Sequence, residues 1–207
     1  MIGSHDTFTY LNPSCKFHNL TKRWWKTQCK TITEQYAAGV RMFDIRVCLK
    51  NDKWTYCHGV VDFNEGERTL IDICLYMKEF CPEAIYRIVL EKGNKYDKIA
   101  FKIEGYDLCK KFPNLWRVDI KSSGKWNGAV DNNNNSLYDR GYLFAKGEIW
   151  EPPYSHEWHG FVTKENFLSI NLKKEAKAIN SQIIFDGDKM KSKETLYFID
   201  YCTNEYK

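Results

Sequence analysis

Two opposite charges lie in one of the most apolar stretches of the chain, Val40–Val47. If this stretch is a β-strand, side-chain alternation puts Asp44 and Arg46 on one face, and Phe43 and Ile45 on the other. An arbitrary Asp-x-Arg pair is usually the polar side of a solvated edge strand. A run this apolar, however, predicts a strand that is covered on both faces. Asp44 and Arg46 are therefore candidates for a functional site.

Further titratable side chains follow other predicted strands. His5 and Asp6 come after a short strand at the start of the chain. His58 follows the strand Lys53–Cys57, and Asp200 lies in the last predicted strand. Two histidines with carboxylate partners around one arginine suit phosphoryl transfer without a metal, because one imidazole can remove a proton, the other can supply one, and the guanidinium can bind the phosphate. Each proton transfer contributes about 10²- to 10⁴-fold in rate.

The size and composition of the chain predict one folded domain, residues 1–207. The hydrophobic share is 43%, and no apolar run is long enough to span a membrane. The formal charge of +4 comes from 31 Lys and Arg against 27 Asp and Glu, which is too balanced to indicate nucleic-acid binding. The aromatic residues also do not interleave with a basic stripe. A small positive charge is compatible with contact with an anionic membrane surface. We expect a monomer.

The start of the chain and the cysteine pattern both predict a cytoplasmic location. No cationic start followed by an apolar segment is visible, so we expect no secretory signal. The eight cysteines contain no Cys-x-x-Cys pair, which favours reduced, buried thiols over a disulfide framework or a zinc site. Cys48 and Cys57 could approach each other across a hairpin, but we do not expect a bond between them.

Alternating strand and helix signals predict the fold class. A capping box at Thr31 and Glu34 predicts a helix that ends at Gly39. A second helix is predicted from Thr69, with apolar positions at helical spacing until Pro82. This alternation predicts an α/β fold with a parallel sheet, and the number of strands is close to that of a closed (β/α)8 barrel of the TIM type. The chain is short for such a barrel, so we expect trimmed helices or a distorted barrel.

A barrel would gather the candidate side chains at one end. Ligands bind at the carboxyl ends of the parallel strands in this fold, and we expect all the candidates to occupy or follow such ends. The first and last strands are neighbours in a closed barrel. His5 and Asp200 are therefore expected to lie close together.

Several segments resemble the catalytic region of bacterial-type phosphatidylinositol-specific phospholipase C, a family of TIM-barrel phosphodiesterases. The resemblance covers about the first ninety residues and the C-terminus, with no match between Ser122 and Thr195. The segments that carry it are Gly3–Thr7, Gln35–Val47, Tyr56–Gly59, Phe80–Leu90 and Phe198–Tyr201.

The resemblance implies a role for each histidine. His5 would be the general base that takes the proton of the inositol 2-hydroxyl, with Asp200 orienting its ring. His58, coupled to Asp6, would be the general acid that protonates the diacylglycerol leaving group. The product would be a cyclic inositol phosphate.

The resemblance also implies catalysis without a metal or other cofactor. Arg46, with Asp44 beside it, would stabilise the phosphate. In the calcium-dependent members of the family a metal ion does this work, and the position that matches Arg46 is acidic. Arg46 therefore argues against a catalytic metal.

The predicted substrate-binding residues depart from the family pattern. Bacterial members carry a lysine after the third strand, where this chain has Glu91 followed by Lys92. Either Glu91 pairs with Arg46, or the register slips by one residue and Lys92 points inward. Lys121 is a candidate for the basic contact with inositol on the following strand.

Two alternatives and one surface feature stay open. A metal-dependent glycerophosphodiesterase-like or sphingomyelinase-D-like barrel would need a His-x-Glu or Glu-x-Asp set, which Asp44-x-Arg46 breaks. A catalytically silent barrel that binds phosphorylated head groups or a protein partner is favoured only by the altered substrate pocket.

Trp24 and Trp25 lie among basic residues. Such a patch usually packs on its own domain. At the rim of a phospholipid-cleaving enzyme it would instead suit peripheral contact with a membrane.

Overall fold

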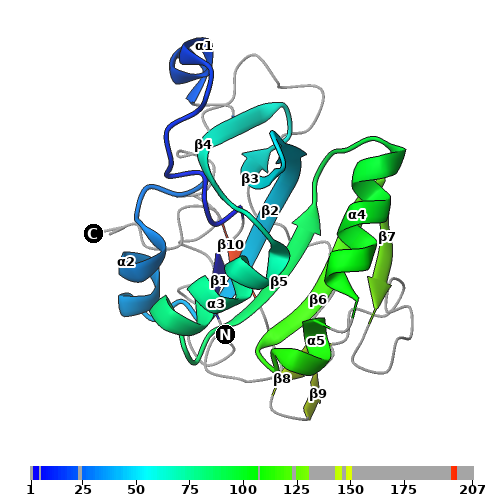
Figure 1. The fold of residues 1–207 in the computed structure, drawn as a ribbon. Helices are drawn as coiled ribbons and strands as arrows, with labels where there is room; N and C mark the ends of the chain where they lie inside the picture. Colours follow the sequence, from blue (N-terminus) through cyan, green and yellow to red (C-terminus); the bar gives the residue numbers. More distant parts are fainter. Residues whose placement is uncertain are drawn as a thin grey trace.

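The computed structural model describes residues 2–4, 6–22, 25–106, 108–122, 125–130, 143–145, 148–150 and 197–199. Within these ranges the chain has an α/β fold built on one large curled sheet (Figure 1). The strands are β1 Ile2–Ser4, β2 Met42–Lys50, β3 Lys53–His58, β4 Val61–Glu67, β5 Ile85–Leu90, β6 Leu115–Ser122, β7 Lys125–Val130, β8 Leu143–Ala145, β9 Glu148–Trp150 and β10 Tyr197–Ile199. The helices are α1 Lys16–Leu20, α2 Ile32–Ala37, α3 Leu70–Phe80, α4 Lys95–Gly105 and α5 Leu108–Lys111.

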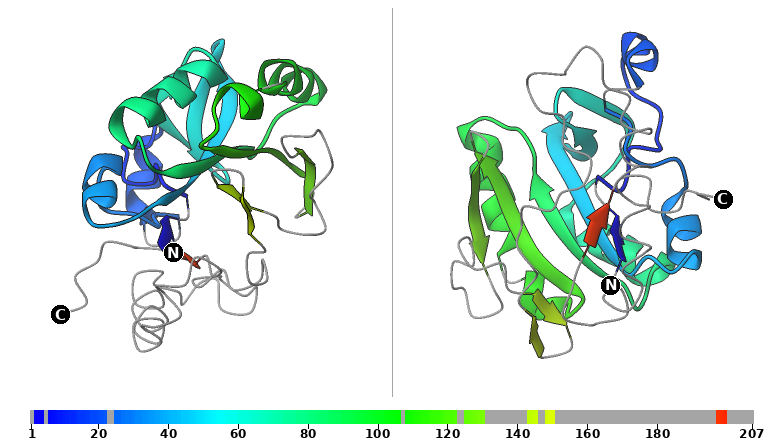
Figure 2. Two further views of the ribbon diagram at one scale, coloured as in Figure 1. Left: turned by 90° about the horizontal axis from the view of Figure 1, so that it is seen from below. Right: turned by 180° about the vertical axis from the view of Figure 1, so that it is seen from behind.

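The large sheet is parallel through its centre, as the sequence predicts. Its strand order is β10-β1-β2-β5-β6-β7, and the first five of these strands run parallel. Ser4 of β1 pairs with Ile199 of β10, so the first and last described strands are neighbours (Figure 2). β7 and β10 end this order without pairing with each other in the described part of the chain. Closure into a (β/α)8 barrel stays a prediction.

Two antiparallel additions interrupt the predicted strand–helix alternation. β3 and β4 form a meander on β2, and β7 folds back on β6. His58 therefore ends an antiparallel strand, and the prediction that every site residue follows a parallel strand end was wrong for it. The physical reason is the tight turn at Asn51 and Asp52, both with positive φ, which returns the chain directly alongside β2.

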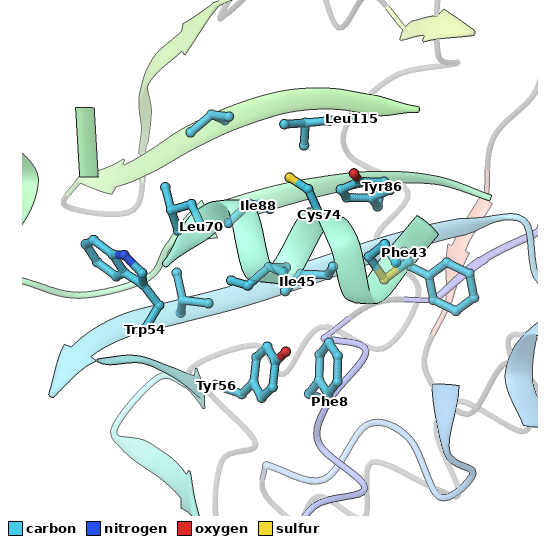
Figure 3. Packing of buried hydrophobic residues seen from close by; sticks show 14 of the residues in the cluster. Phe8, Phe43, Ile45, Trp54, Tyr56, Leu70, Cys74, Tyr86, Ile88 and Leu115 are labelled. Atoms are coloured by element: carbon cyan, nitrogen blue, oxygen red, sulfur yellow. The ribbon is translucent and has the colours of Figure 1, made fainter. Parts of the chain in front are cut away.

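The core lies between the sheet and α3. Phe43 and Ile45 of β2 and Ile88 of β5 are fully buried and pack beneath α3 (Figure 3). Asp44 and Arg46 lie on the opposite face of β2, as side-chain alternation predicts. Both faces of β2 are covered, because its residues 42–48 are all buried.

The helix start predicted at Thr31 and the one predicted at Thr69 both form, each with a capping box. Thr31 caps α2 in a reciprocal capping box with Glu34, and Gly39 follows the helix with a φ of 96°. Thr69 caps α3 in the same way through Asp72. Among the described residues, no helix is both long and apolar enough to cross a bilayer.

Candidate active site

The site lies beside the middle of β2, between the part of this strand that pairs with β1 and the part that pairs with β3. β1 pairs with β2 at Met42 and Phe43, while β3 pairs with its far end, from Val47 to Lys50. Between these two pairings, the segment after β1 and the end of β3 meet β2. The face that carries Asp44 and Arg46 is therefore open to Asp6 and His58.

Arg46 is the centre of a buried cluster of charges. Its Nε pairs with a carboxylate oxygen of Asp6 and lies 3.0 Å from Oδ2 of Asp44. Its Nη1 lies 3.1 Å from Oε2 of Glu91. The Arg46 side chain is only 6% exposed, so these pairs are little screened by water. Burial alone would lower the pKa of Arg46, but the charges of Asp44, Asp6 and Glu91 outweigh it and raise the pKa.

A second arginine supports the cluster from the neighbouring strand. Asp44 and Arg87 face each other in the parallel register of β2 and β5, and Arg87 Nε donates to Asp44 Oδ1 at 2.6 Å. Arg87 is 4% exposed. Arg87 is a site residue that the sequence analysis did not predict. The available signal was the same as for Asp44, namely a charge in the middle of an apolar strand.

Asp6 is held in place by hydrogen bonds of the backbone around it as well as by the ion pairs of its carboxylate. Its φ is 45°, a left-handed conformation that Asp tolerates better than most residues. The Asp6 amide donates to Asp44 Oδ2 at 3.3 Å, and the Thr7 amide donates to the Asp44 carbonyl oxygen at 2.9 Å. The loop after β1 is thus fixed on β2, and the Asp6 carboxylate stays between Arg46 and His58.

Both ring nitrogens of His58 face acceptors. Nε2 lies 3.0 Å from Asp6 Oδ2, and Nδ1 lies 2.6 Å from the Trp25 carbonyl oxygen. A ring that donates from both nitrogens is the protonated imidazolium. Burial alone lowers the pKa of His58, but the charge and hydrogen bond of Asp6 and the Trp25 carbonyl raise it above the ordinary value of 6.5. His58 is thereby arranged as a proton donor.

The opposite charges in the cluster balance. Its three carboxylates, those of Asp6, Asp44 and Glu91, face two guanidinium groups and the ring of His58, whose protonated form completes the balance. Such balance is what makes a buried cluster of this size tolerable, since an unpaired charge in a protein interior costs several kcal/mol. Where the chain is described, no group of three or more His, Cys, Asp and Glu side chains is arranged to hold a metal ion.

The structure decides between the two registers left open by the sequence. Glu91 points to Arg46, while Lys92 pairs with Asp62 of β4. The Lys92 ammonium is therefore engaged away from Arg46, and its contact with substrate stays a prediction. Lys121 lies in β6, and only its backbone is described. His5 and Asp200 lie outside the described residues, although the strands that precede them pair side by side.

The structure also bears on the tryptophan pair. Trp25 is 5% exposed, packs on Phe63, and donates from its indole nitrogen to the His18 carbonyl oxygen. The Trp25 ring therefore belongs to the core, which is the usual outcome for such a patch. Trp24 lies outside the described residues.

Comparison with known proteins gives a likeness in fold. No family model and no curated protein matches the chain. The solved structure of phosphatidylinositol-specific phospholipase C from Listeria monocytogenes has a TM-score of 0.55 and 16% identity, over 97% of this chain and 87% of that one. Two structures of the Staphylococcus aureus enzyme, titled for modulation of its membrane binding, have TM-scores of 0.55 and 0.53 at 16% identity, and each covers 97% of this chain and 85% of that one. At this identity the likeness shows the fold alone.

Proposed function

We propose that this chain is a phosphodiesterase that cleaves the phosphorus–oxygen bond of an inositol phospholipid or a related phosphodiester. The observation that carries the proposal is the contact of Arg46 and His58 with the same carboxylate, Asp6. A guanidinium is suited to bind a phosphate, and an adjacent imidazolium is suited to protonate its leaving group. The fold shared with solved phosphatidylinositol-specific phospholipases C supports the choice of substrate class.

His58 acts as the general acid of this mechanism, together with Asp6. The raised pKa favours the protonated ring, which a general acid requires. The side chain is 21% exposed, so a substrate can reach it. As the bond to the leaving oxygen breaks, the His58 imidazolium transfers a proton to the departing alkoxide, which leaves as an alcohol, and Asp6 keeps the ring in place.

His5 supplies the general base and Asp200 orients it. The support for this pairing is the register of β1 and β10, in which Ser4 and Ile199 are partners immediately before these two residues. With His5 as base, the 2-hydroxyl of an inositol ring attacks the phosphorus and a cyclic phosphate forms. A carboxylate on the far ring nitrogen would fix the tautomer of the base.

Arg46 stabilises the phosphate in place of a metal ion. Its guanidinium lies among three carboxylates, the position in which a cation is most stabilised. Glu91 shares that guanidinium with the incoming phosphate, so substrate binding and the Arg46–Glu91 pair compete. We therefore expect phosphodiester cleavage to continue in excess chelator.

Exposed apolar side chains near His58 suit a lipid substrate. Phe17 and Leu20 of α1 are 65% and 81% exposed, and Val60, two residues after His58, is 81% exposed. α1 lies close to the site through the hydrogen bond of Trp25 to His18. Peripheral membrane contact then involves these residues, with Trp24 as the further sequence-based candidate.

Variants of the two central cations test the proposal. The rate of release of water-soluble phosphate ester from vesicles of phosphatidylinositol and phosphatidylcholine is compared among four proteins. His58→Ala is expected to reduce kcat by about 10²- to 10⁴-fold. Arg46→Lys keeps the charge but loses the planar fork, and is expected to cost about 10²- to 10³-fold. Glu83→Gln, an exposed residue outside the cluster and outside α1, is the control and should match the parent chain.

Each alternative function has its own outcome in the same assay. Full activity in His58→Ala would remove the acid–base mechanism. Activity that chelator abolishes would favour a metal-dependent glycerophosphodiesterase-like enzyme. Head-group binding without turnover of any phosphodiester would favour the catalytically silent barrel.

A further inference from the structure

The helix α4 carries an apolar row on the side that faces away from the sheet. The row follows helical spacing and consists of Tyr96, Ile99, Ile103 and the C-cap residue Tyr106. Their exposed fractions are 79%, 45%, 71% and 66%. Apolar residues of a helix in a globular protein normally face the core, so this row reverses the usual arrangement.

The opposite side of α4 attaches the helix to the fold. Phe101 is 1% exposed and meets the Trp54 ring edge to face, with 5.4 Å between the ring centroids. A Cβ added at Gly105 would lie 2.8 Å from Cγ1 of Val118, so the helix packs directly on β6. Figure 2 shows α4 on the outer side of the sheet. The apolar row therefore takes no part in holding α4 on the sheet.

Three lysines lie beside the apolar row. Lys95, Lys98 and Lys102 line an open hollow of about 510 Å³, and Ile99 of the row lines it with them. In the part of the chain that the structure describes, no carboxylate forms an ion pair with these three lysines. The hollow is therefore basic on one side and apolar on the other.

Both carboxylates of α4 are engaged elsewhere. Asp97 accepts from the Asn94 amide at 2.8 Å and so caps the start of the helix. Glu104 accepts from the Trp54 indole and from the Leu70 amide, on the side towards α3. The outward side of α4 consequently has a net positive charge.

We propose that the outward side of α4 docks on the surface of a bilayer that contains anionic phospholipids. A helix that lies in the interface of a bilayer presents apolar side chains to the acyl boundary and lysines to the head groups. Tyrosine is enriched at this depth, because its ring is apolar and its hydroxyl is polar. The lysine-lined hollow takes the phosphate of a head group, and the apolar row beside it contacts the acyl boundary.

Charge selects a bilayer over a second copy of the chain. A symmetric dimer through α4 would place the same surface of each copy face to face. The three lysines of one copy would then meet those of the other, and like charges repel. An anionic bilayer supplies the opposite charge, and its surface potential attracts lysines that lie within a Debye length.

The docked helix brings the candidate active site towards the bilayer. β5 ends at Leu90, and α4 begins at Lys95, so Glu91 with its partner Arg46 lies just before this helix in the chain. Figure 1 shows the start of α4 at the same end of the sheet as α1. The inference concerns binding alone and does not depend on the proposed phosphodiesterase chemistry.

Sedimentation with vesicles tests the proposal on the full chain. Sucrose-loaded vesicles of phosphatidylcholine, with or without phosphatidylglycerol, are pelleted, and the bound fraction of the protein is measured. One variant combines Lys95→Gln, Lys98→Gln and Lys102→Gln. We expect it to bind vesicles with phosphatidylglycerol about 10²-fold more weakly than the parent chain, from about fivefold for each lysine. Unchanged binding would overturn the proposal.

A matched variant separates the place of the charges from their number. Lys30→Gln, Lys53→Gln and Lys78→Gln together remove the same charge from exposed lysines of other elements. This variant should bind the vesicles nearly as the parent chain does, because attraction to the surface falls off within a Debye length. Equal losses in the two variants would overturn the proposal, since binding would then follow net charge alone.

The apolar row has a test of its own. Ile99→Ser and Ile103→Ser, combined in one variant, should weaken binding to the anionic vesicles by at least about tenfold, because both side chains lose apolar surface that the bilayer would bury. Both residues are exposed in the free chain, so the fold should be kept, and circular dichroism checks this. Binding equal to that of the parent chain would contradict contact of this row with the bilayer.

Two further outcomes separate this inference from its rivals. A dimer seen by ultracentrifugation without vesicles, and dispersed by the Ile99→Ser and Ile103→Ser changes, would assign the surface to a second copy and overturn the proposal. Phosphatidylglycerol carries no inositol, so binding is measured apart from turnover of an inositol phospholipid. Vesicle binding that depends on the three lysines, in a chain that cleaves no inositol phospholipid, would support docking by α4 and contradict the proposed function.

Discussion

Single buried charges carry most of the functional information in this chain. Asp44 and Arg46 were recognisable because two opposite charges in an apolar strand must be paired or used. The same signal existed for Arg87, but its partner is 43 residues away and depends on the register of β2 against β5. Sequence periodicity gives the face of a strand and not its register, so the Asp44–Arg87 pair could not be predicted.

Glu91 is the residue whose change should strengthen substrate binding. Glu91→Gln removes one negative charge next to Arg46 and keeps an oxygen that can accept from Nη1. We expect KM for the phosphodiester to fall by about three- to tenfold, the effect of roughly one hydrogen bond to the phosphate. Steady-state kinetics on the variant and on the exposed-site control Glu83→Gln measure this. A rise in KM would mean that Glu91 positions Arg46 instead of competing for it.

The raised pKa of His58 predicts a pH dependence for stability and for rate. The folded chain binds the His58 proton more tightly than the unfolded chain. The stabilisation is therefore complete below the unfolded value of about 6.5 and is lost as the pH rises through the folded pKa. The rate should fall over the same upper range, because the general acid is then deprotonated.

Chemical denaturation of the parent chain and of His58→Gln measures the stability effect at several pH values. The difference in the free energy of unfolding should be largest at acidic pH and should shrink on the alkaline side. His18→Gln serves as the control for the loss of a histidine. A difference that grows with rising pH would contradict the assignment of an imidazolium at His58.

At the scale of elements, helix boundaries were more predictable than the placement of strands. The capping boxes at Thr31 and Thr69 are local, and both act as the sequence indicates. Phe80, the last residue of α3, is 40% exposed, so the apolar spacing before Pro82 does not by itself mark burial. The β3–β4 meander was missed as a sheet addition, although it brings His58 back to β2.

One carboxylate ties three elements together behind the site. Glu104 of α4 accepts from the Trp54 indole of β3 at 2.8 Å and from the Leu70 amide of α3 at 3.0 Å. Trp54 is fully buried, so Glu104→Ala leaves its N–H without this partner. We expect the free energy of unfolding to fall by about 1–3 kcal/mol. Denaturant titration checks this, with the exposed Glu79→Ala as control; equal stability of the two variants would contradict the role of Glu104.

For the whole molecule, the α/β class and the parallel centre of the sheet followed from the sequence. Barrel closure depends on residues that follow β7, where the sequence carries weak signals and an asparagine run at 132–135. The monomeric state and the cytoplasmic location stay predictions. The chain shares its fold with phospholipase C structures at only 16% identity. The proposed function therefore rests on the charge cluster and not on overall sequence similarity.

The proposed function requires that Arg46 and His58 cleave a phosphodiester without a metal ion. Phosphorus NMR of phosphatidylinositol vesicles incubated with the protein in excess chelator tests it most directly. We predict the appearance of a cyclic inositol phosphate in the parent chain and its absence in His58→Ala. Loss of the cyclic product on addition of chelator, with recovery on addition of calcium, would contradict the claim.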